Sequence, residues 1–187
     1  MRIVSIDFET ANYSPVSACA LGLAIFEANE LVSAPYWLIK PPQGHDHFNA
    51  QWTRDIHGLS ANHVRNAPGF QDIATEVVAH LVAADIVVAH NAAFDMRVLR
   101  ALFQHFSRPT PTFNYLCTCR TARKVWSTLP NHRLSTLVTH IGHTFQHHHA
   151  GSDAEAAGRV LLAMTKPANT EELTSWLQAL KITTRSF

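Results

Sequence analysis

Two carboxylates stand close together near the start of the chain, in the segment Asp7-Phe8-Glu9 that ends an apolar run. Successive side chains of a strand point to opposite faces, so Asp7 and Glu9 share one face and Phe8 points to the other. Two like charges on one face repel each other, and a bound cation relieves that repulsion. The pair therefore indicates a metal site, although two solvated acids at a strand end would give the same pattern.

Two further carboxylates lie where helices are expected to begin. Asp95 is one turn into a helix predicted from about Ala92 to Phe106, directly after the apolar run 85–89, which is typical of a buried strand. Ligand sites in α/β sheets form where strands end and helices begin. Asp153 begins a helix predicted over 153–164, whose apolar stripe aims the carboxylate toward the core. Taken alone, Asp153 is more typical of a helix cap.

Four acids in these positions can hold two divalent ions roughly 3.5–4 Å apart, which stabilises both the attacking and the leaving oxygen of a phosphoryl displacement. Mg²⁺ or Mn²⁺ fits best, because hard oxygen ligands select these ions. The reaction also needs a base for the attacking water, and a histidine suits neutral pH. His148 can take that role from the loop before Asp153. Without the acids, it would be one more exposed histidine in a His-rich loop.

The elements that must position these residues form an α/β pattern. Three strand-like segments come first and are typical of a meander, and helices mixed with a short strand follow. Strands are expected at 3–6, 18–26, 31–39 and 85–89, and helices at 70–82, 92–106, 134–141, 153–164 and 170–180. The polar stretch after Pro41, to about Ser60, is predicted to be a loop. This order of elements indicates a layered α/β domain.

Length and composition set further limits. With 187 residues and 47% hydrophobic content, we expect one domain over 1–187, with a core of about 1–165 and an amphipathic C-terminal helix at about 170–181. No apolar run is long enough to span a membrane and no signal-peptide pattern is present, so we expect a cytoplasmic location. A net charge of +1 argues against phosphate contacts along a long duplex, because proteins that make such contacts are usually strongly basic. Cys19, Cys117 and Cys119 fit reduced thiols.

Three segments together resemble the exonuclease motifs of the DEDDh superfamily: Asp7-Phe8-Glu9-Thr10, His90-Asn91-Ala92-Ala93-Phe94-Asp95 and His148-His149-Ala150-Gly151-Ser152-Asp153-Ala154. Each motif is weak alone, but their order and intervals across most of 1–165 make the combination specific. The chain looks most similar to bacterial polymerase III epsilon-like and RNase T-like members. The resemblance implies an RNase H-like fold, with a mixed sheet of a three-strand meander plus parallel strands flanked by helices. It also implies two-metal hydrolysis from a 3′ end, releasing nucleoside 5′-monophosphates.

The resemblance carries roles to individual positions. It implies metal ligands at Asp7, Glu9, Asp95 and Asp153, a general base at His148, and a pocket for the 3′-terminal nucleotide at Thr10, Ile56, His57, Asn91 and Phe94. An aromatic face such as that of Phe94 stacks on any base, although a core-packing role fits its helical spacing equally well.

Two departures from the family pattern leave questions open. Ala11-Asn12 stand where many members carry a threonine or glycine pair, which leaves the contacts to the sugar open. The run His147-His148-His149 offers neighbouring candidates for the base, and only the spacing to Asp153 selects His148.

We expect single-stranded DNA or short oligonucleotides as substrate, in repair, proofreading or turnover. RNA is the closest alternative, because contacts to the 2′-hydroxyl would decide between the two. A different class of function is a non-catalytic nucleic-acid-binding or polymerase-binding module, and a third is zinc binding by the histidines of 140–149. A polymerase or a second copy of the chain could be the partner.

Overall fold

The computed structural model describes residues 1–187, and its sheet is built on a long antiparallel pair. β1 (Arg2–Thr10) pairs with β2 (Ala18–Glu27) along its whole length. A tight turn then leads from β2 into β3 (Glu30–Ser33). Its two residues, Ala28 and Asn29, have positive φ angles of 48° and 68°. Two successive positive φ angles are typical of the hairpin turn that matches the twist of the flanking strands.

The third predicted strand, 31–39, is in fact two strands, so the prediction of one continuous strand was wrong. β3 pairs with the end of β2, and β4 (Tyr36–Leu38) pairs with its first half. Pro35 lies between them and interrupts the ladder, because proline has no N–H to donate. Its carbonyl still accepts a hydrogen bond from Leu23 N–H at 2.9 Å.

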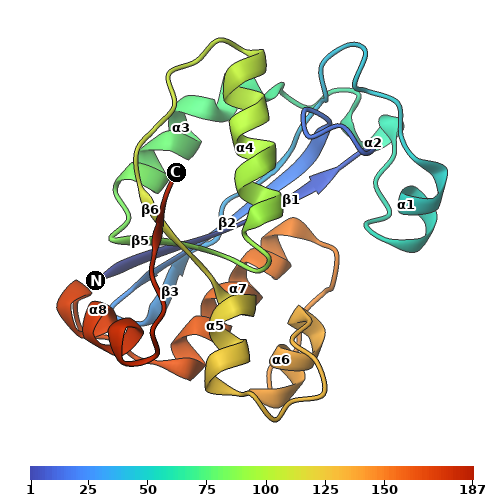
Figure 1. Cartoon of the computed structure of the whole chain (residues 1–187). Helices are drawn as coiled ribbons and strands as arrows, with labels where there is room; N and C mark the ends of the chain where they lie inside the picture. The colour runs from blue at the N-terminus through green and yellow to red at the C-terminus, as the bar shows by residue number, and fades with distance from the viewer.

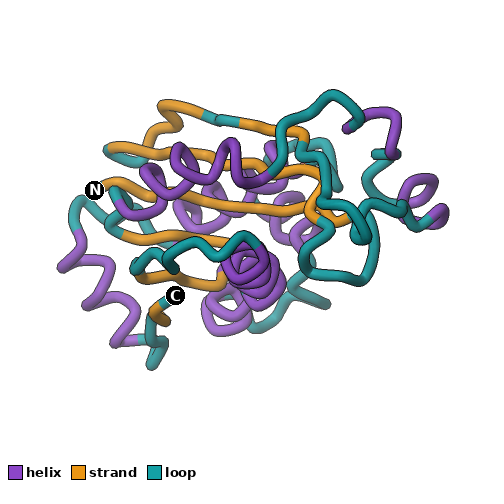
Figure 2. Tube along the Cα trace, turned by 90° about the horizontal axis from the view of Figure 1, so that it is seen from above, coloured by secondary structure: helices purple, strands orange, loops and turns teal.

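Parallel strands extend the sheet on the other side of β1. β5 (Ile86–Ala89) lies parallel to β1, and β6 (Asn114–Cys117) lies parallel to β5. A short final strand, β7 (Arg185–Ser186), pairs antiparallel with β6. The resulting order is β3-β2-β1-β5-β6-β7, with β4 also on β2, and Figure 2 shows these strands running side by side in one layer. This mixed sheet confirms the predicted α/β, RNase H-like fold. β6 and β7 were not predicted, because they are too short to show a periodicity.

Helices cover both faces of the sheet (Figure 1). In chain order they are α1 (Ala50–Asp55), α2 (Ala61–Val64), α3 (Phe70–Val82), α4 (Ala93–His105), α5 (Thr118–Val125), α6 (Leu134–His140), α7 (Ala150–Met164) and α8 (Thr170–Ala179). α3 and α4 pack on the face that carries Ile6 and Phe8. α7 and α8 pack on the opposite face, which carries Ile3. Since Asp7 and Glu9 alternate with Phe8 along β1, they belong to the α7 face.

Three helical features differ from the predictions. α1 lies in the stretch predicted to be a loop, because it buries none of its residues and so has no apolar stripe; the Asn49 side chain caps it. α2 lies just after that stretch, in residues for which no element was predicted. α5 was not predicted at all. α7 begins at Ala150, three residues before the predicted start, because His149 caps it by accepting the Ser152 N–H.

α7 lies unusually close to the sheet. A Cβ on Gly158 would lie 2.2 Å from the Phe26 ring, and one on Gly22 would lie 2.2 Å from the Ala150 carbonyl oxygen. Such distances are too short for any real Cβ, so both glycines are required by the close approach of helix and strand. This packing fixes the start of α7, which carries Asp153.

The C-terminal helix packs on the same sheet. Leu173 and Leu177 of α8 are buried in one cluster with Ile3 and Ile86. The apolar face of α8 is therefore covered by the strands of its own chain. No helix combines the length and the hydrophobicity that crossing a membrane would need.

Candidate active site

Three carboxylates from two different elements converge on the α7 face of the sheet. Asp7 and Glu9 come from the end of β1, and Asp153 comes from the first turn of α7. One potential ligand atom of each lies within 4.8 Å of the others, a spacing suited to a shared cation. Glu9 and Asp153 are buried, and Asp7 is half-buried. The close approach of α7 to β2 therefore brings together acids that are far apart in the chain.

Asp95 approaches the same acids from α4. Its side chain is fully buried, and its Oδ1 accepts a hydrogen bond from Phe8 N–H at 3.1 Å. Its Oδ2 has no hydrogen-bond partner. A buried carboxylate oxygen without a partner is costly, and a coordinated cation would supply the missing interaction.

The electrostatics of these acids point the same way. Burial, and then the neighbouring carboxylates, raise the pKa of Glu9 to about 8 and raise the pKa of Asp7 well above its usual range. Burial raises the pKa of Asp95 to about 8, against the opposing effect of its backbone hydrogen bonds. Burial raises the pKa of Asp153, opposed mainly by His147. Carboxylates this crowded are held in their charged form only when positive charge is added among them.

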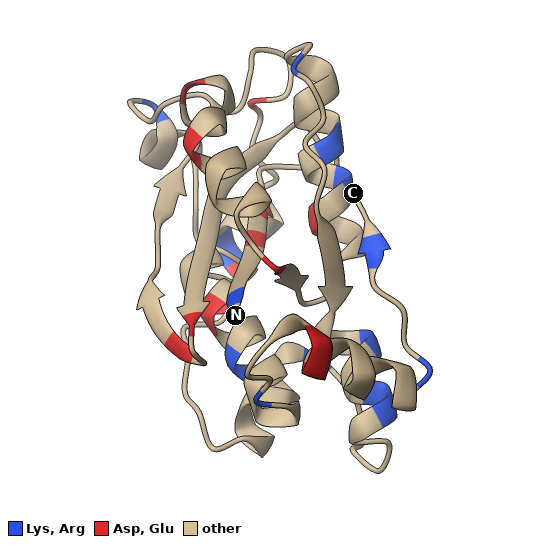
Figure 3. Ribbon diagram, turned by 90° about the vertical axis from the view of Figure 1, so that its left-hand side faces the viewer, with Lys and Arg blue, Asp and Glu red and all other residues tan.

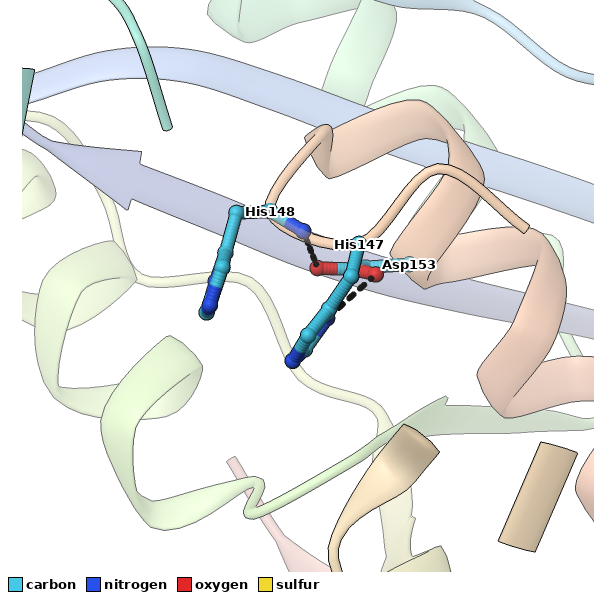
Figure 4. Close-up of side chains that lie close together, drawn as sticks. All are labelled: His147, His148 and Asp153. Carbon is cyan, nitrogen blue, oxygen red and sulfur yellow. Dashed lines mark hydrogen bonds and ion pairs between the residues drawn. The ribbon is translucent and has the colours of Figure 1, made fainter. Parts of the chain in front are cut away.

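The three consecutive histidines have three different positions, and Figure 4 shows two of them, His147 and His148, beside Asp153. His149 caps α7 and stacks on Tyr36, with ring centroids 4.5 Å apart. His147 Nδ1 lies 3.3 Å from Asp153 Oδ1. His148 donates its backbone N–H to Asp153 Oδ2 at 3.0 Å, and its ring stacks on that of His147. The His148 ring makes no hydrogen bond, so it is free to interact with a substrate or a water molecule.

The backbone at His148 lies in the left-handed region, with φ of 63°. This conformation is uncommon for a residue with a side chain, and it occurs often at functional sites. Burial, and then the neighbouring His147, lower the pKa of His148, while Asp153 opposes the shift. The His148 ring is consequently neutral at neutral pH and able to accept a proton.

The acids and histidines line a cleft of about 590 Å³. Besides Asp7, Glu9, Asp153, His147 and His148, its walls are formed by Phe8, His90, Asn91, Phe94, Cys119, Arg123, Asn131, His132, Arg133 and Leu134. Two of the predicted pocket residues, Asn91 and Phe94, are among them. Burial lowers the pKa of His90 to about 4, and its Nδ1 lies 3.0 Å from the Thr118 hydroxyl.

The other three predicted pocket residues lie outside those walls. His57 Nδ1 accepts a hydrogen bond from the Leu59 N–H, so the ring proton is on Nε2, which donates to the Thr10 carbonyl at 3.2 Å. The hydrogen bond joins the segment after α1 to the end of β1. Ile56, beside His57, is 39% exposed. These residues form a rim next to the acids rather than a wall of the cleft.

The basic residues of the cleft, Arg123 on α5 and Arg133 before α6, were not predicted from the sequence. A signal was present, because the apolar run Tyr115-Leu116-Cys117 precedes Arg123 as a buried strand would. Ligand-binding residues commonly follow the carboxyl end of such a strand. The run was too short to identify without its neighbours in the sheet.

A model of the RNase T family, described as an exonuclease, matches residues 4–161. The chain belongs to this exonuclease family. It is a hydrolase, and the resemblance to 3′-to-5′ exonucleases of the DEDDh type is confirmed. Members of the family depend on divalent metal ions, in keeping with the carboxylate cluster.

Individual relatives agree with the family assignment. This exonuclease is 32% identical over 178 residues to the PolC-type DNA polymerase III of Oceanobacillus iheyensis, a match that covers 94% of this chain and 12% of that protein. Its fold is similar to that of exonuclease X in complex with 5′-overhanging duplex DNA, with a TM-score of 0.67, 22% identity and coverage of 87% and 90% of the two chains. It is also similar to the nuclease domain of 3′hExo, a DEDDh family member bound to rAMP (TM-score 0.73, 14% identity, coverage of 87% and 90%).

Proposed function

We propose that this exonuclease removes nucleotides one at a time from the 3′ end of single-stranded DNA or short oligonucleotides and releases nucleoside 5′-monophosphates. The observation that carries the proposal is the convergence of Asp7, Glu9 and Asp153 within 4.8 Å, with the unpartnered Asp95 Oδ2 buried beside them. A cluster of this kind is unfavourable in a protein that does not bind cations.

In this proposal Asp7, Glu9, Asp95 and Asp153 hold two divalent ions, Mg²⁺ or Mn²⁺. A site made only of oxygen donors favours these hard ions over zinc, because zinc prefers histidine and cysteine ligands. When bound, the ions neutralise the charge that develops on the phosphoryl group. The protein's own contribution is to keep four carboxylates aligned without a positive side chain among them. Asp95 is tied to the backbone of β1 at Phe8, and Asp153 to the backbone of His148.

His148 acts as the general base. Its neutral ring takes a proton from the attacking water while the bond between phosphorus and the leaving 3′ oxygen breaks. His147 is the competing candidate because its ring lies beside that of His148 and its Nδ1 is near Asp153. We assign His147 a positioning role, since its Nδ1 already interacts with Asp153. His149 is engaged as the cap of α7.

We assign the 3′-terminal nucleotide to the region between Phe94 and the rim at His57. Phe94 lines the cleft at the start of α4 and offers a ring for base stacking. Asn91 precedes it with a positive φ of 62°, which turns the chain into α4. Thr10, Ile56 and His57 complete the pocket on the side of β1.

DNA is favoured over RNA in this proposal by the sequence similarity to a DNA polymerase. The chain corresponds to only 12% of that polymerase. Its similarity to part of a polymerase supports two further parts of the proposal, an association with a DNA polymerase and a role in proofreading or repair. We also propose that residues 1–187 fold as one exonuclease domain.

The decisive experiment uses the purified chain with matched DNA and RNA oligonucleotides labelled at the 5′ end, in the presence of Mg²⁺, Mn²⁺ or EDTA. The expected result is a ladder that shortens stepwise from the 3′ end only with metal, and faster on DNA. Asp7→Asn should slow it by about 10² or more, as removal of a metal ligand does. A strong preference for RNA would overturn the DNA assignment, and metal-independent cleavage would overturn the metal site.

A further inference from the structure

A second cavity, of about 340 Å³, lies beside the catalytic cleft. It is enclosed by the start of α4, by β6 and α5, and by the C-terminal segment that includes β7. Asn91, Cys119 and Arg123 line both the cavity and the cleft. The two hollows are therefore neighbours that share a wall.

The second cavity is positively charged. Arg120, Arg123 and Arg185 line it, and no acidic residue does. None of the three arginines takes part in an ion pair. Figure 3 shows several basic segments on the side of the molecule that carries the C-terminus. In a chain with a net charge of only +1, this local excess of free guanidinium groups marks a place for anions.

The wall formed by the C-terminal segment is anchored at its last residue. Arg185 pairs with Tyr115 in the ladder between β7 and β6. Phe187 donates its backbone N–H to the Phe113 carbonyl at 3.0 Å and stacks on the Phe113 ring, with centroids 4.7 Å apart. Arg100 of α4 lies 4.6 Å above the Phe187 ring. The end of the chain thus holds Arg185 in a defined place beside α5.

We propose that this second cavity binds an internucleotide phosphate of the substrate strand, on the 5′ side of the bond that is cut. The inference rests on the proposed function, which assigns the 3′-terminal nucleotide to Phe94 and the rim at His57. The second cavity shares Asn91, Cys119 and Arg123 with the cleft, whereas none of the rim residues Thr10, Ile56 and His57 lines it. Guanidinium groups bind phosphate oxygens in pairs of hydrogen bonds, and they do so regardless of base sequence.

The test compares two substrates. Thymidine 5′-monophosphate p-nitrophenyl ester has no phosphate upstream of the bond that breaks, whereas a DNA decamer has several. Arg120→Ala and Arg185→Ala should each raise the KM for the decamer by about fivefold, the effect of one partly exposed ion pair, and leave kcat and turnover of the ester unchanged. Arg120→Lys keeps the positive charge, so its KM for the decamer should be close to that of the wild type. Lys124→Ala is the matched control, because Lys124 is an exposed cation on α5 that lines neither hollow.

A binding measurement in EDTA separates this inference from the proposed function, since it needs no turnover. The affinity for fluorescent oligothymidylates should rise from two to four nucleotides in the wild type, and rise less in Arg120→Ala and Arg185→Ala. The slope of the salt dependence of binding should fall by about 0.7 for each phosphate that the variant no longer neutralises.

Each outcome decides one question. If the wild type cleaves both substrates and the arginine variants keep the wild-type KM for the decamer, the second cavity does not hold the strand. Equal competition by inorganic phosphate or a nucleoside monophosphate at every oligonucleotide length would instead make it a product or phosphate site, and would also overturn the inference. If no substrate is cleaved but affinity still depends on length and on both arginines, the inference survives and the proposed function fails.

Discussion

Gly22 of β2 touches the backbone of Ala150, the first residue of α7, and it does so beside the catalytic cleft. A Cβ on Gly22 would lie 2.2 Å from the Ala150 carbonyl oxygen. Gly22 also pairs with Asp7 in the β1–β2 ladder. One small residue therefore sets the separation between the strand that carries Asp7 and the helix that carries Asp153.

Gly22→Ala should push α7 away from the sheet. We expect the free energy of unfolding to fall by about 1–3 kcal/mol, as overpacking of a tight interface typically costs. Activity should fall by about 10², because a displacement of roughly 1 Å between catalytic groups has that effect. Thermal unfolding and kcat measure the two effects. Gly69→Ala is the control, because no atom lies closer than 3.4 Å to its added Cβ. Full activity in Gly22→Ala would show that the approach of α7 does not align the acids.

His148→Ala should lower kcat by about 10²–10⁴, the usual contribution of a general base. His147→Ala should cost less, about tenfold, because it removes only an interaction with Asp153 that helps to place that acid. His143→Ala serves as a control from the same His-rich segment, since it lies outside the cleft. The pH dependence of kcat should lose its acidic limb in His148→Ala. A larger reduction in His147→Ala than in His148→Ala would transfer the base role to His147.

In EDTA, the stability of the protein should fall as the pH rises. The folded-state pKa of Asp95 is about 8, above its unfolded value, so between those two values the folded protein binds more protons than the unfolded chain. The free energy of unfolding therefore decreases with increasing pH across that window, and the raised pKa of Glu9 contributes in the same direction. Urea unfolding from about pH 6.5 to pH 8 measures the slope, because at lower pH the lowered pKa of His90 acts in the opposite direction. A stability that rises with pH in EDTA would contradict the crowding of these carboxylates.

Mg²⁺ should cancel that decrease in stability, because it stabilises the charged carboxylates of the folded state. Asp95→Asn should be more stable than the wild type at pH 8 in EDTA, by about 1–2 kcal/mol, and should gain less from Mg²⁺. Glu76→Gln neutralises an exposed acid of α3 and is the matched control for the change of charge. Equal stabilisation of wild type and Asp95→Asn by Mg²⁺ would remove Asp95 from the metal site.

Phe187→Ala should loosen β7, since it removes the stacked pair with Phe113, at a cost of about 0.5–1.5 kcal/mol. Arg185 would then be held less firmly, and the KM for a DNA decamer should rise about threefold relative to that for the p-nitrophenyl ester. Phe187→Tyr retains the ring and should behave as the wild type. If Phe187→Ala changes the KM of both substrates equally, the C-terminal stack supports the whole fold rather than the second cavity.

Several features of this protein could be predicted from local sequence. The apolar periodicity of α3 and α4 predicted both helices almost to the residue, because each buries a continuous stripe on the sheet. Alternation along β1 placed Asp7 and Glu9 on one face, which the burial of Phe8 on the other face bears out. The three motifs indicated the exonuclease family, since a metal site of carboxylates needs fixed residue types at fixed element ends.

Other features depend on contacts between distant segments, and they emerge only in the folded chain. The strands β6 and β7 are recognised by their pairing with neighbours, because runs of four and two residues are too short to be identified from local pattern. The different positions of His147, His148 and His149 follow from the start of α7 at Ala150, which packs closely against Gly22. The second cavity is lined by α5 and by the C-terminal segment, which are about 60 residues apart in the chain. Local sequence specifies which way a side chain points, but packing alone determines what it meets there.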